Sequence, residues 1–422
     1  MTQDGLHIGW REVWGGHYAV RLSAVDRARH VYLLGQTGTG KSTLLQHLVA
    51  QDIASGEGLA LIDPHGDLID DILELVPGHR IDDVILIDPS DREHVVGFNP
   101  FYRVAAEDRP LVASNLVASF RHVWGDSWGP RLEYILYNTV AALLDAPDAC
   151  RASFLAIPRL LVDRDYRARV LSGVTDVRVQ SFFRDEFERW SERQLAEALS
   201  PVQNKIGQVV GNPLIRNVLS QWRPSFDLAG ALAARRILLV RVPKGELGAD
   251  PANLLGSLLV ASILQAAMRR GRDAPRVPFH LYIDEFQNFT TDAFASILSE
   301  ARKYALTLTI GHQYLEQLLP DVRAAVFGNV GSLIAFRLGA DDAAVLAREF
   351  GTIAPGVLRD LRRGEVVMQR TASTGVGEVF RMQTAPPQAV IGRGRKVVAK
   401  SRRSYGRPRA AVEDRIARWL RS

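Results

Sequence analysis

A short glycine-rich stretch has the residue types and the spacing that phosphate binding requires. Residues 35–43 read GQTGTGKST and fit the pattern G-x-x-x-x-G-K-[ST] from Gly35 to Ser42. Phosphates are bound by a curved loop of exposed N–H groups, which glycine permits, followed by a helix N-terminus. Lys41 would reach the β- and γ-phosphates, and the Ser42 hydroxyl would bind Mg²⁺. The sequence therefore predicts a nucleotide site formed by Gly35, Thr37, Gly38, Thr39, Gly40, Lys41, Ser42 and Thr43.

An acidic pair lies at the end of a later apolar run, HLYIDEF, residues 280–286. A nucleotide hydrolase with such a loop needs an aspartate at a strand end to bind Mg²⁺, and Asp284 has that position. The adjacent Glu285 would polarise the attacking water. Two solvated acids at an exposed strand end are the alternative, which the glycine-rich loop disfavours.

Two polar residues flank the next apolar run, LTLTIG, residues 306–311. Gln313 follows this predicted strand, so its amide would lie beside the γ-phosphate and orient the water. Arg302 precedes the strand and would lie at the far end of the sheet. It is therefore predicted to project into a neighbouring subunit's site as an arginine finger. The alternative is a surface arginine at the C-terminal end of a helix.

Apolar runs that alternate with helical patterns must position these groups. Parallel strands of an α/β fold are predicted at HVYLLG, GLALIDP, VILIDP, RILLVRVP, FHLYIDE, LTLTIG and SLIAFRL. From about residue 106 to 230 the pattern is helical, with one amphipathic stripe around Leu136 and Val140. This pattern predicts an all-α domain inserted into the α/β core.

The predicted organisation has five parts. They are a short N-terminal β appendage (1–30), the first part of the core (31–105), the inserted helical domain (106–230), the second part of the core (231–390) and a basic flexible tail (391–422). The tail begins after two prolines and is rich in Arg, Gly and Ser, although AVEDRIARWL within it has the pattern of a short amphipathic helix.

The positive charge is concentrated in the tail. The formal net charge of the 422 residues is +5, but the tail carries eleven cations and two acids, so the remainder is −4. A polyanion would therefore be attracted to the tail or to local patches and not to the body as a whole. DNA binding by the tail and a solvated docking arm are both consistent with this composition.

The N-terminus has neither the basic nor the apolar region of a signal peptide, and the longest apolar run, from Leu254, is short for a membrane span. A single cysteine, Cys150, excludes an internal disulfide. A cytoplasmic protein is predicted, one that a partner could recruit to the inner face of the membrane.

The complete motif set resembles a known superfamily. Its members are GQTGTGKST, IDPHGDL, GFNP, YIDEFQNF, SEARKY with LTIGHQYLEQL, and NVGSLIAFRLGADDA. This set is similar to the HerA/FtsK superfamily of hexameric DNA-pumping ATPases, and within it to the TraG/TraD-type coupling proteins of conjugative type IV secretion. The resemblance extends from about residue 5 to 385 and implies a RecA-like core with a helical domain inserted at this point.

The resemblance also implies residue roles. Lys41 and Ser42 would bind phosphate and Mg²⁺, and Asp284 would bind Mg²⁺. Glu285 would activate water, Gln313 would sense the γ-phosphate, and Arg302 would act in trans in a homo-hexamer with DNA in its pore. Asp63 and Asp67 match a family motif near the site. ATP and Mg²⁺ are the implied cofactors, and a secretion channel, a relaxase or a nuclease is the implied partner.

Two features depart from that family and leave alternatives. Membrane-anchored coupling proteins carry N-terminal transmembrane helices, which this sequence lacks, and the N-terminal appendage is short for the β-barrel of HerA proteins. The alternatives are a soluble HerA-like motor that works with a nuclease in DNA processing or defence, and a nucleotide-gated adaptor that docks protein substrates through residues 106–230. An ABC-type ATPase is disfavoured, because LSGVTD at Leu171 lacks the second glycine and the glutamine of LSGGQ.

Overall fold

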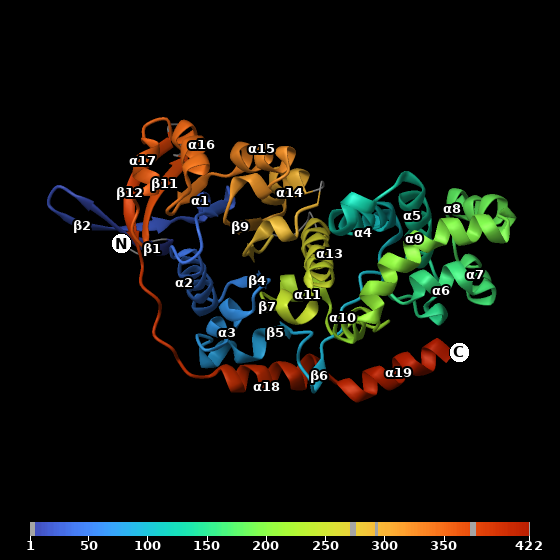
Figure 1. Ribbon diagram of the computed structural model, residues 1–422. Coiled ribbons are helices and arrows are strands. Elements are labelled where there is room, and N and C mark those ends of the chain that lie inside the picture. Colours follow the sequence, from blue (N-terminus) through green and yellow to red (C-terminus); the bar gives the residue numbers. More distant parts are fainter. Residues whose placement is uncertain (1–4, 271–275, 292–293, 372–376, 422) are drawn as a thin grey trace. The chain divides into compact units, whose positions relative to one another are not determined.

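The chain divides into two units, each formed from several stretches of sequence. Unit 1 comprises Met1–Leu86, Leu228–Arg241 and Ala266–Ser401, and unit 2 comprises Ile87–Asp227, Val242–Gln265 and Arg402–Ser422. The computed structural model describes residues 5–270, 276–291, 294–371 and 377–421 (Figure 1). The first four residues of the predicted N-terminal appendage and the last residue of the predicted tail lie outside the described residues.

Unit 1 is built on one sheet, in which the described residues form eleven strands. In spatial order these are β2 (Gly16–Leu22), β1 (Leu6–Val13), β12 (Gly377–Thr384), β11 (Glu365–Thr371), β10 (Ser332–Ala335), β3 (Val31–Leu34), β9 (Leu306–His312), β8 (Phe279–Ile283), β4 (Gly58–Asp63), β7 (Ile237–Arg241) and β5 (Val84–Ile87). From β10 to β7 the neighbouring strands are parallel. Strands β11, β12, β1 and β2 extend this parallel part as antiparallel neighbours.

The parallel strands are buried along their whole length, which explains why their sequences are continuous apolar runs. Every residue of β3, β4, β8 and β9 is buried, as expected when helices cover both faces of a sheet. The helices that lie wholly within unit 1 are α1 (Ala24–Ala28), α2 (Lys41–Ala54), α3 (Asp67–Leu73), α11 (Leu228–Ala233), α14 (Phe294–Glu300), α15 (Pro320–Asn329), α16 (Ala340–Phe350) and α17 (Pro355–Arg359). The predicted α/β class is confirmed.

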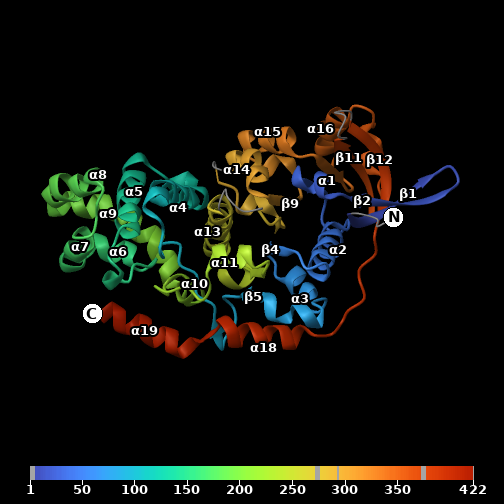
Figure 2. The same cartoon turned by 180° about the vertical axis from the view of Figure 1, so that it is seen from behind.

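Unit 2 is mainly helical (Figure 2). Its helices are α4 (Arg109–Trp124), α5 (Pro130–Leu144), α6 (Ala156–Val162), α7 (Arg164–Leu171), α8 (Val177–Ser181), α9 (Glu192–Gly211), α10 (Pro213–Leu219), α12 (Lys244–Leu247), most of α13 (Ala249–Met268) and α19 (Arg409–Arg421). A two-stranded sheet pairs β6 (His94–Val95) with β13 (Arg407–Pro408). The predicted stripe on α5 is buried, including Ile135, Leu136 and Val140.

Helix α13 is longer than the apolar run predicted from the sequence. Among the described residues it is the one helix whose length and composition would allow it to cross a membrane, and 72% of its most apolar window is buried inside the protein. Core helices of this length have the same properties.

The C-terminal segment differs from the predicted flexible tail. It forms helix α18 (Gly394–Tyr405), β13 and α19. Val397 of α18 is fully buried in the core of unit 1, and Val412 and Ile416 of α19 are buried in unit 2. The apolar residues are widely spaced along a very basic sequence, so overall composition conceals the buried helical face.

Candidate functional site

The glycine-rich loop connects β3 to α2 at the carboxyl edge of the parallel strands. Gly38 and Gly40 have φ values of 76° and 117°, in the left-handed region that favours glycine. A Cβ atom on Gly35 would lie 2.4 Å from Cβ of Phe336, so this position also requires glycine. The amide of Gly35 donates to the carbonyl of His312 at 3.2 Å, and Thr39 O accepts from the amide of Gly364 at 2.9 Å.

Lys41 is the first residue of α2 and lies beneath the loop. Gly40 before it provides no side-chain cap, so the first N–H groups of the helix remain available for an anion. The Lys41 ammonium donates to the carbonyl of Gly35. Burial lowers the pKa of Lys41, and the carboxylates of Glu285 and Asp284 oppose this effect. Ser42, the next residue, is exposed, and its hydroxyl is accessible to a metal ion.

Asp284 follows the end of β8 at the same edge of the sheet. Its amide donates to Ile62 O of β4 at 3.1 Å, and its Oδ1 accepts from the amide of Glu285 at 3.0 Å. A Cβ atom on Gly311 of β9 would lie 2.9 Å from Asp284 Oδ1. The neighbouring strand must therefore carry glycine at this position for the carboxylate to fit.

Burial, followed by the negative charges of Glu285 and Asp63, raises the pKa of Asp284 to about 6, and Lys41 opposes this shift. The site thus contains three carboxyl groups and a single ammonium, so the acidic groups outnumber the cation. Mg²⁺ binds through one or two carboxylates together with nucleotide phosphates. Asp284 and the Ser42 hydroxyl therefore fit an Mg²⁺ ion, whose positive charge would offset that of the acidic groups. Among the described residues no group of three or more His, Cys, Asp or Glu could hold a metal by itself.

A chain of side-chain hydrogen bonds joins the loop to Glu285. Thr37 Oγ1 donates to Gln313 Oε1 at 3.0 Å, and Gln313 Nε2 donates to Glu285 Oε1 at 2.6 Å. Gln287 Nε2 donates to the other oxygen, Glu285 Oε2, at 2.8 Å. Glu285 itself has φ 49° and ψ 51°, a left-handed conformation that costs energy outside glycine and is often found at functional sites.

The aspartates of the DPHGD stretch have different environments. Asp63, at the end of β4, is buried and accepts from the amides of His65 at 2.9 Å and Ile69 at 3.2 Å. It thereby shapes the turn into α3, and its charge also acts on Asp284. Asp67 is exposed at the first position of α3.

The structure does not bring Arg302 to the other predicted residues. Arg302 is exposed in a short 3₁₀ turn, Ala301–Tyr304, immediately before β9. Strand β9 has seven residues, so it separates Arg302 from Gln313 by about 23 Å at ~3.3 Å per residue. Lys41, Asp284, Glu285 and Gln313 lie at one edge of the sheet, and Arg302 lies at the opposite edge.

Sequence reasoning missed the residues that support this site. Gln287 holds the second oxygen of Glu285, and Gly311 leaves space for Asp284. His312, next to Gln313, is buried and pairs its Nδ1 with the Tyr32 hydroxyl at 3.0 Å. Burial, followed by the charge of Lys41, lowers the pKa of His312 to about 3, so it is neutral. Of these residues, Gln287 could have been found from the sequence, because it lies in the motif YIDEFQNF.

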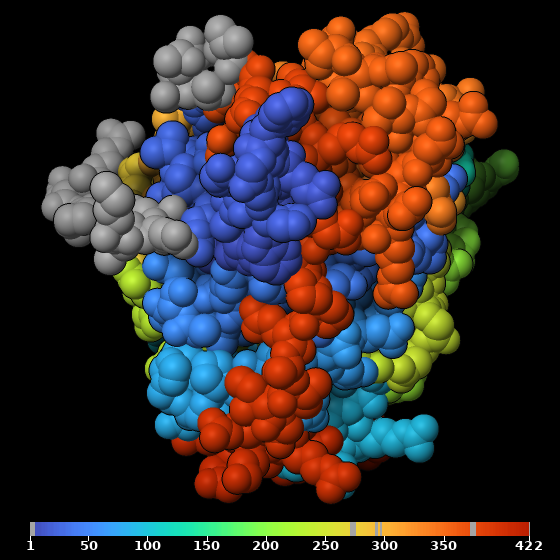
Figure 3. All heavy atoms as spheres, turned by 90° about the vertical axis from the view of Figure 1, so that its left-hand side faces the viewer, coloured from blue at the N-terminus to red at the C-terminus, as the bar shows by residue number. Residues whose placement is uncertain are grey.

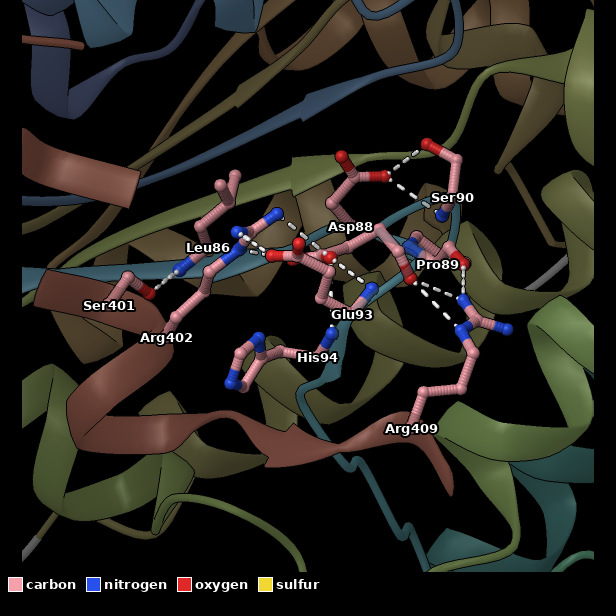
Figure 4. Close-up of polar contacts among 10 residues, drawn as sticks. Leu86, Asp88, Pro89, Ser90, Glu93, His94, Ser401, Arg402 and Arg409 are labelled. Carbon is pink, nitrogen blue, oxygen red and sulfur yellow. Dashed lines mark hydrogen bonds and ion pairs between the residues drawn. The ribbon is translucent and has the colours of Figure 1, made fainter. Parts of the chain in front are cut away.

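Several cations of the C-terminal segment have partners within the chain, and Figure 4 shows Arg402 and Arg409. In unit 2, Arg402 donates to Asp91 Oδ2 at 2.7 Å and to Glu93 Oε2 at 2.6 Å, and Arg409 donates to Pro89 O at 3.0 Å. In unit 1, Lys400 pairs with Asp82 at 2.9 Å, and the amide of Leu86 donates to Ser401 Oγ at 2.9 Å.

Comparisons with known proteins identify similar sequences and folds. Residues 17–90 match the family described as "Helicase HerA, central domain". The Type 4 coupling protein DotL of Legionella pneumophila is 23% identical over 383 residues, which cover 74% of this chain and 48% of that protein. The chain thus spans about half the length of this curated relative.

Solved structures of the plasmid coupling protein TrwB have a similar fold. TrwB with the non-hydrolysable GTP analogue GDPNP has a TM-score of 0.66 at 16% identity, covering 89% of each chain. TrwB with ADP and Mg²⁺ has a TM-score of 0.64 at 16% identity, covering 89% of this chain and 88% of that one. These findings confirm the predicted RecA-like P-loop fold with an all-α part, and the resemblance to TraG/TraD-type proteins of the HerA/FtsK superfamily.

Proposed function

We propose that this chain is an ATP-hydrolysing motor of the conjugative coupling-protein type, which moves DNA through the pore of a ring of six copies. The observation that carries the proposal is the group formed by Lys41, Asp284, Glu285 and Gln313 at the carboxyl edge of the sheet, joined to the loop through Thr37. The similarity to DotL and TrwB supports a coupling ATPase in general. The proposal goes beyond this similarity in two respects, the movement of DNA and the assembly of six copies.

The residues of the site have distinct tasks in this proposal. The loop amides and Lys41 hold the β- and γ-phosphates of ATP, and Ser42 and Asp284 hold Mg²⁺. When bound, Mg²⁺ neutralises phosphate charge. Glu285 accepts a proton from the attacking water, and Gln313 orients that water.

Two glutamines orient Glu285 for this task. Both of its oxygens accept amide hydrogen bonds, from Gln313 and Gln287. Each carboxylate oxygen can accept a further hydrogen bond, so Glu285 can keep these contacts while it accepts one from the attacking water. The Gln313 amide also links Glu285 to Thr37 of the loop, which keeps the general base beside the phosphate site.

The position of Arg302 is an argument for a ring of subunits. It lies about one strand length from its own chain's phosphate site, and its edge of the sheet is opposite to the loop. In a head-to-tail ring the amino edge of one copy meets the carboxyl edge of the next, which places Arg302 where it can stabilise charge in the neighbour's site.

Two variants test the chemistry. Lys41→Ala should abolish nucleotide binding or hydrolysis, because Lys41 contacts phosphate before the reaction. Glu285→Gln should still bind ATP but turn it over very slowly, because Glu285 acts mainly on water. Both are measured by fluorescent-nucleotide binding and phosphate release, with and without DNA. Near-native turnover of Glu285→Gln would remove this carboxylate from the mechanism.

The same assay separates the motor from the other functions. ATPase activity that DNA stimulates supports a motor, and activity that DNA leaves unchanged supports a nucleotide-gated adaptor. Genes for a relaxase and channel components beside this one would place a motor in conjugation, where a partner recruits it to the inner face of the membrane. A neighbouring nuclease gene would place it in DNA processing or defence.

A further inference from the structure

One group of arginines in unit 2 differs from the other cations of the C-terminal segment. The segment after β12 crosses the surface of unit 1 to α18 (Figure 3) and continues in unit 2 as β13 and α19. There Arg402, Arg409 and Arg418 each pair with an acid. Within the described residues no carboxylate forms an ion pair with five other arginines of unit 2, which are Arg103, Arg151, Arg223, Arg407 and Arg415.

Two of these arginines lie against aromatic rings. The guanidinium of Arg103 lies 5.2 Å from the ring centroid of Tyr102, and that of Arg223 lies 4.4 Å from the ring centroid of Trp222. The two rings meet edge to face, with their centroids 6.5 Å apart. All four side chains are at least partly exposed. Guanidinium groups and flat rings therefore alternate along this part of the surface.

Arg407 connects this group to α19. Its guanidinium donates to Oε1 of the buried Gln221 at 2.6 Å and to Arg223 O at 3.0 Å. Burial, followed by the charges of Arg415 and Arg223, lowers the pKa of Arg407. Three like charges thus lie near one another without a paired carboxylate, and an anion bound here would offset their mutual repulsion.

A small recess of about 30 Å³ lies beside Trp222, between it and α19. Its wall includes Trp222, Trp419, Val412 and Ile416, and it also includes Arg151 and Arg415. This volume holds about two water molecules, so the recess admits the edge of one flat ring.

The backbone around the recess is held in place. Arg159 donates to Trp419 O at 2.8 Å, and its guanidinium lies 4.6 Å from the Trp419 ring centroid. Arg103 and Arg151 both have a φ of 51°. This left-handed conformation costs energy outside glycine and is often found at ligand sites.

Single-stranded nucleic acid has the chemistry that matches this alternation. Each nucleotide carries one flat base and one phosphate, and proteins that bind single strands combine aromatic rings for stacking with cations that follow the backbone. A duplex keeps its bases inside the stack, so it would contact the arginines and leave the rings unused. A chain of acidic residues would also use the arginines but has no flat ring to place against Trp222.

We propose that the surface formed by Tyr102, Arg103, Trp222, Arg223, Arg407 and Arg415 binds single-stranded DNA, with a base packed against Trp222 at the mouth of the recess. The inference deepens the proposed function, because it names the form of DNA that the chain contacts. It rests on that function for the choice of DNA as the nucleic acid. All the residues belong to unit 2 of one chain, so this contact does not require six copies.

Binding of a labelled oligo(dT) strand, followed by fluorescence anisotropy, is the first test. Trp222→Ala should weaken binding about 5-fold to 100-fold, the usual range for loss of one stacking ring, and should leave the slope of log K against log salt unchanged. Replacing both Arg223 and Arg415 by Gln should flatten this slope by up to about 1.4, since each phosphate contact contributes about 0.7. Both arginines are exposed, so the double variant should remain folded.

The matched control is Arg193→Gln. Arg193 is an arginine of α9 in unit 2, its side chain is 88% exposed, and it pairs with Glu197. Its replacement should change neither affinity nor slope. If the control and the double variant have equal effects, or if Trp222→Ala binds as tightly as the native chain, the inference is overturned.

Photochemical cross-linking tests the location. A strand that contains 5-iodouracil forms a bond to an aromatic side chain beside the base when it is irradiated. Mass spectrometry of the peptides should find the strand attached to Trp222 or Tyr102 of the native chain. Attachment confined to other parts of the chain would overturn the inference.

Competition identifies the partner. Unlabelled oligo(dT) should displace the labelled strand at a lower concentration than a duplex of the same length, oligo(U) or polyglutamate does. Equal or stronger competition by any of these three would overturn single-stranded DNA as the partner.

The outcomes also separate the two proposals. If DNA does not stimulate ATP hydrolysis but the strand cross-links to Trp222, the motor fails and the surface stands. If DNA stimulates hydrolysis and the strand binds equally well to the native chain and to Trp222→Ala, the motor stands and the surface fails.

Discussion

Asp284 is a buried acid whose charge is costly in the absence of a cation. Its pKa is about 6 in the folded chain, against 3.8 for an exposed aspartate. The folded state thus binds the proton more tightly than the unfolded state does, and the ionised carboxylate reduces stability as pH rises from about 4 to above 6.

Asp284→Asn should therefore stabilise the nucleotide-free protein at neutral pH. The pKa difference corresponds to up to about 3 kcal/mol at pH 7.5, falling to roughly half at pH 5. Urea unfolding at both pH values, without Mg²⁺, measures the gain. The same variant should lose Mg²⁺-dependent nucleotide hydrolysis. A gain that is independent of pH would show that ionisation of Asp284 is not its source.

Gly311→Ala should lower turnover without unfolding the protein. The added Cβ would lie 2.9 Å from Asp284 Oδ1, so the carboxylate must shift from its position, and catalytic geometry is sensitive to displacements of about 1 Å. Steady-state kinetics at varied Mg²⁺ should show weaker metal dependence. Gly328→Ala is the control, because a Cβ there meets nothing within 4 Å. Equal kinetics for the two variants would contradict this steric role of Gly311.

Residue spacing predicted some members of the site and could not predict others. Lys41 and Ser42 follow from a local pattern, because one loop and one helix position both. Asp284, Glu285 and Gln313 follow strands, so their meeting at one edge was predictable from parallel order. Gly311 acts only through a neighbour across the sheet, and no local pattern marks such a contact.

Whole elements differ in how clearly their sequences predict them. The continuous apolar runs of β3, β4, β8 and β9 were evident because both faces of these strands are buried. Strands β11 and β12 were not predicted, since their burial is partial and irregular. In the C-terminal segment the pattern AVEDRIARWL predicted a helix, which forms as α19, whereas α18 was hidden by its basic composition.

Helix α18 should contribute measurably to stability. Val397 is fully buried in the core of unit 1, so Val397→Ala removes two methyl groups from a packed site and should cost about 1–2 kcal/mol. Val390→Ala provides the comparison in the same segment, because Val390 is largely exposed and its loss should change stability little. Thermal unfolding of both variants measures the difference. Equal melting temperatures would mean that α18 is not docked in solution.

At the scale of the whole assembly, the separation of Arg302 from Gln313 predicts complementation between chains. Arg302→Ala should bind ATP normally and hydrolyse it about 10³–10⁵ times more slowly, the usual effect of losing an arginine finger. Mixing Arg302→Ala with Lys41→Ala chains creates interfaces that combine an intact loop with an intact arginine. Partial ATPase activity should therefore return in the mixture.

The dilution dependence of the native chain is the control for this experiment. A monomer that hydrolyses ATP at full rate at high dilution would exclude an action of Arg302 in trans. Gln313→Ala should differ from Arg302→Ala, because Gln313 serves its own chain's site. It should give no recovery when mixed with Lys41→Ala.

The pairing of β1 with β12 also determines the order in which the chain can fold during synthesis. Gly9 pairs with Thr384, so all the residues between β1 and β12 must be made before β1 acquires β12 as a neighbour, whereas its other neighbour, β2, follows it directly. Translation proceeds at about 5–20 residues per second, which leaves the nascent hairpin, with Trp10 and Trp14, unpaired against the sheet for on the order of tens of seconds. A chaperone that binds apolar segments near the ribosomal exit would find a target in these residues during that interval.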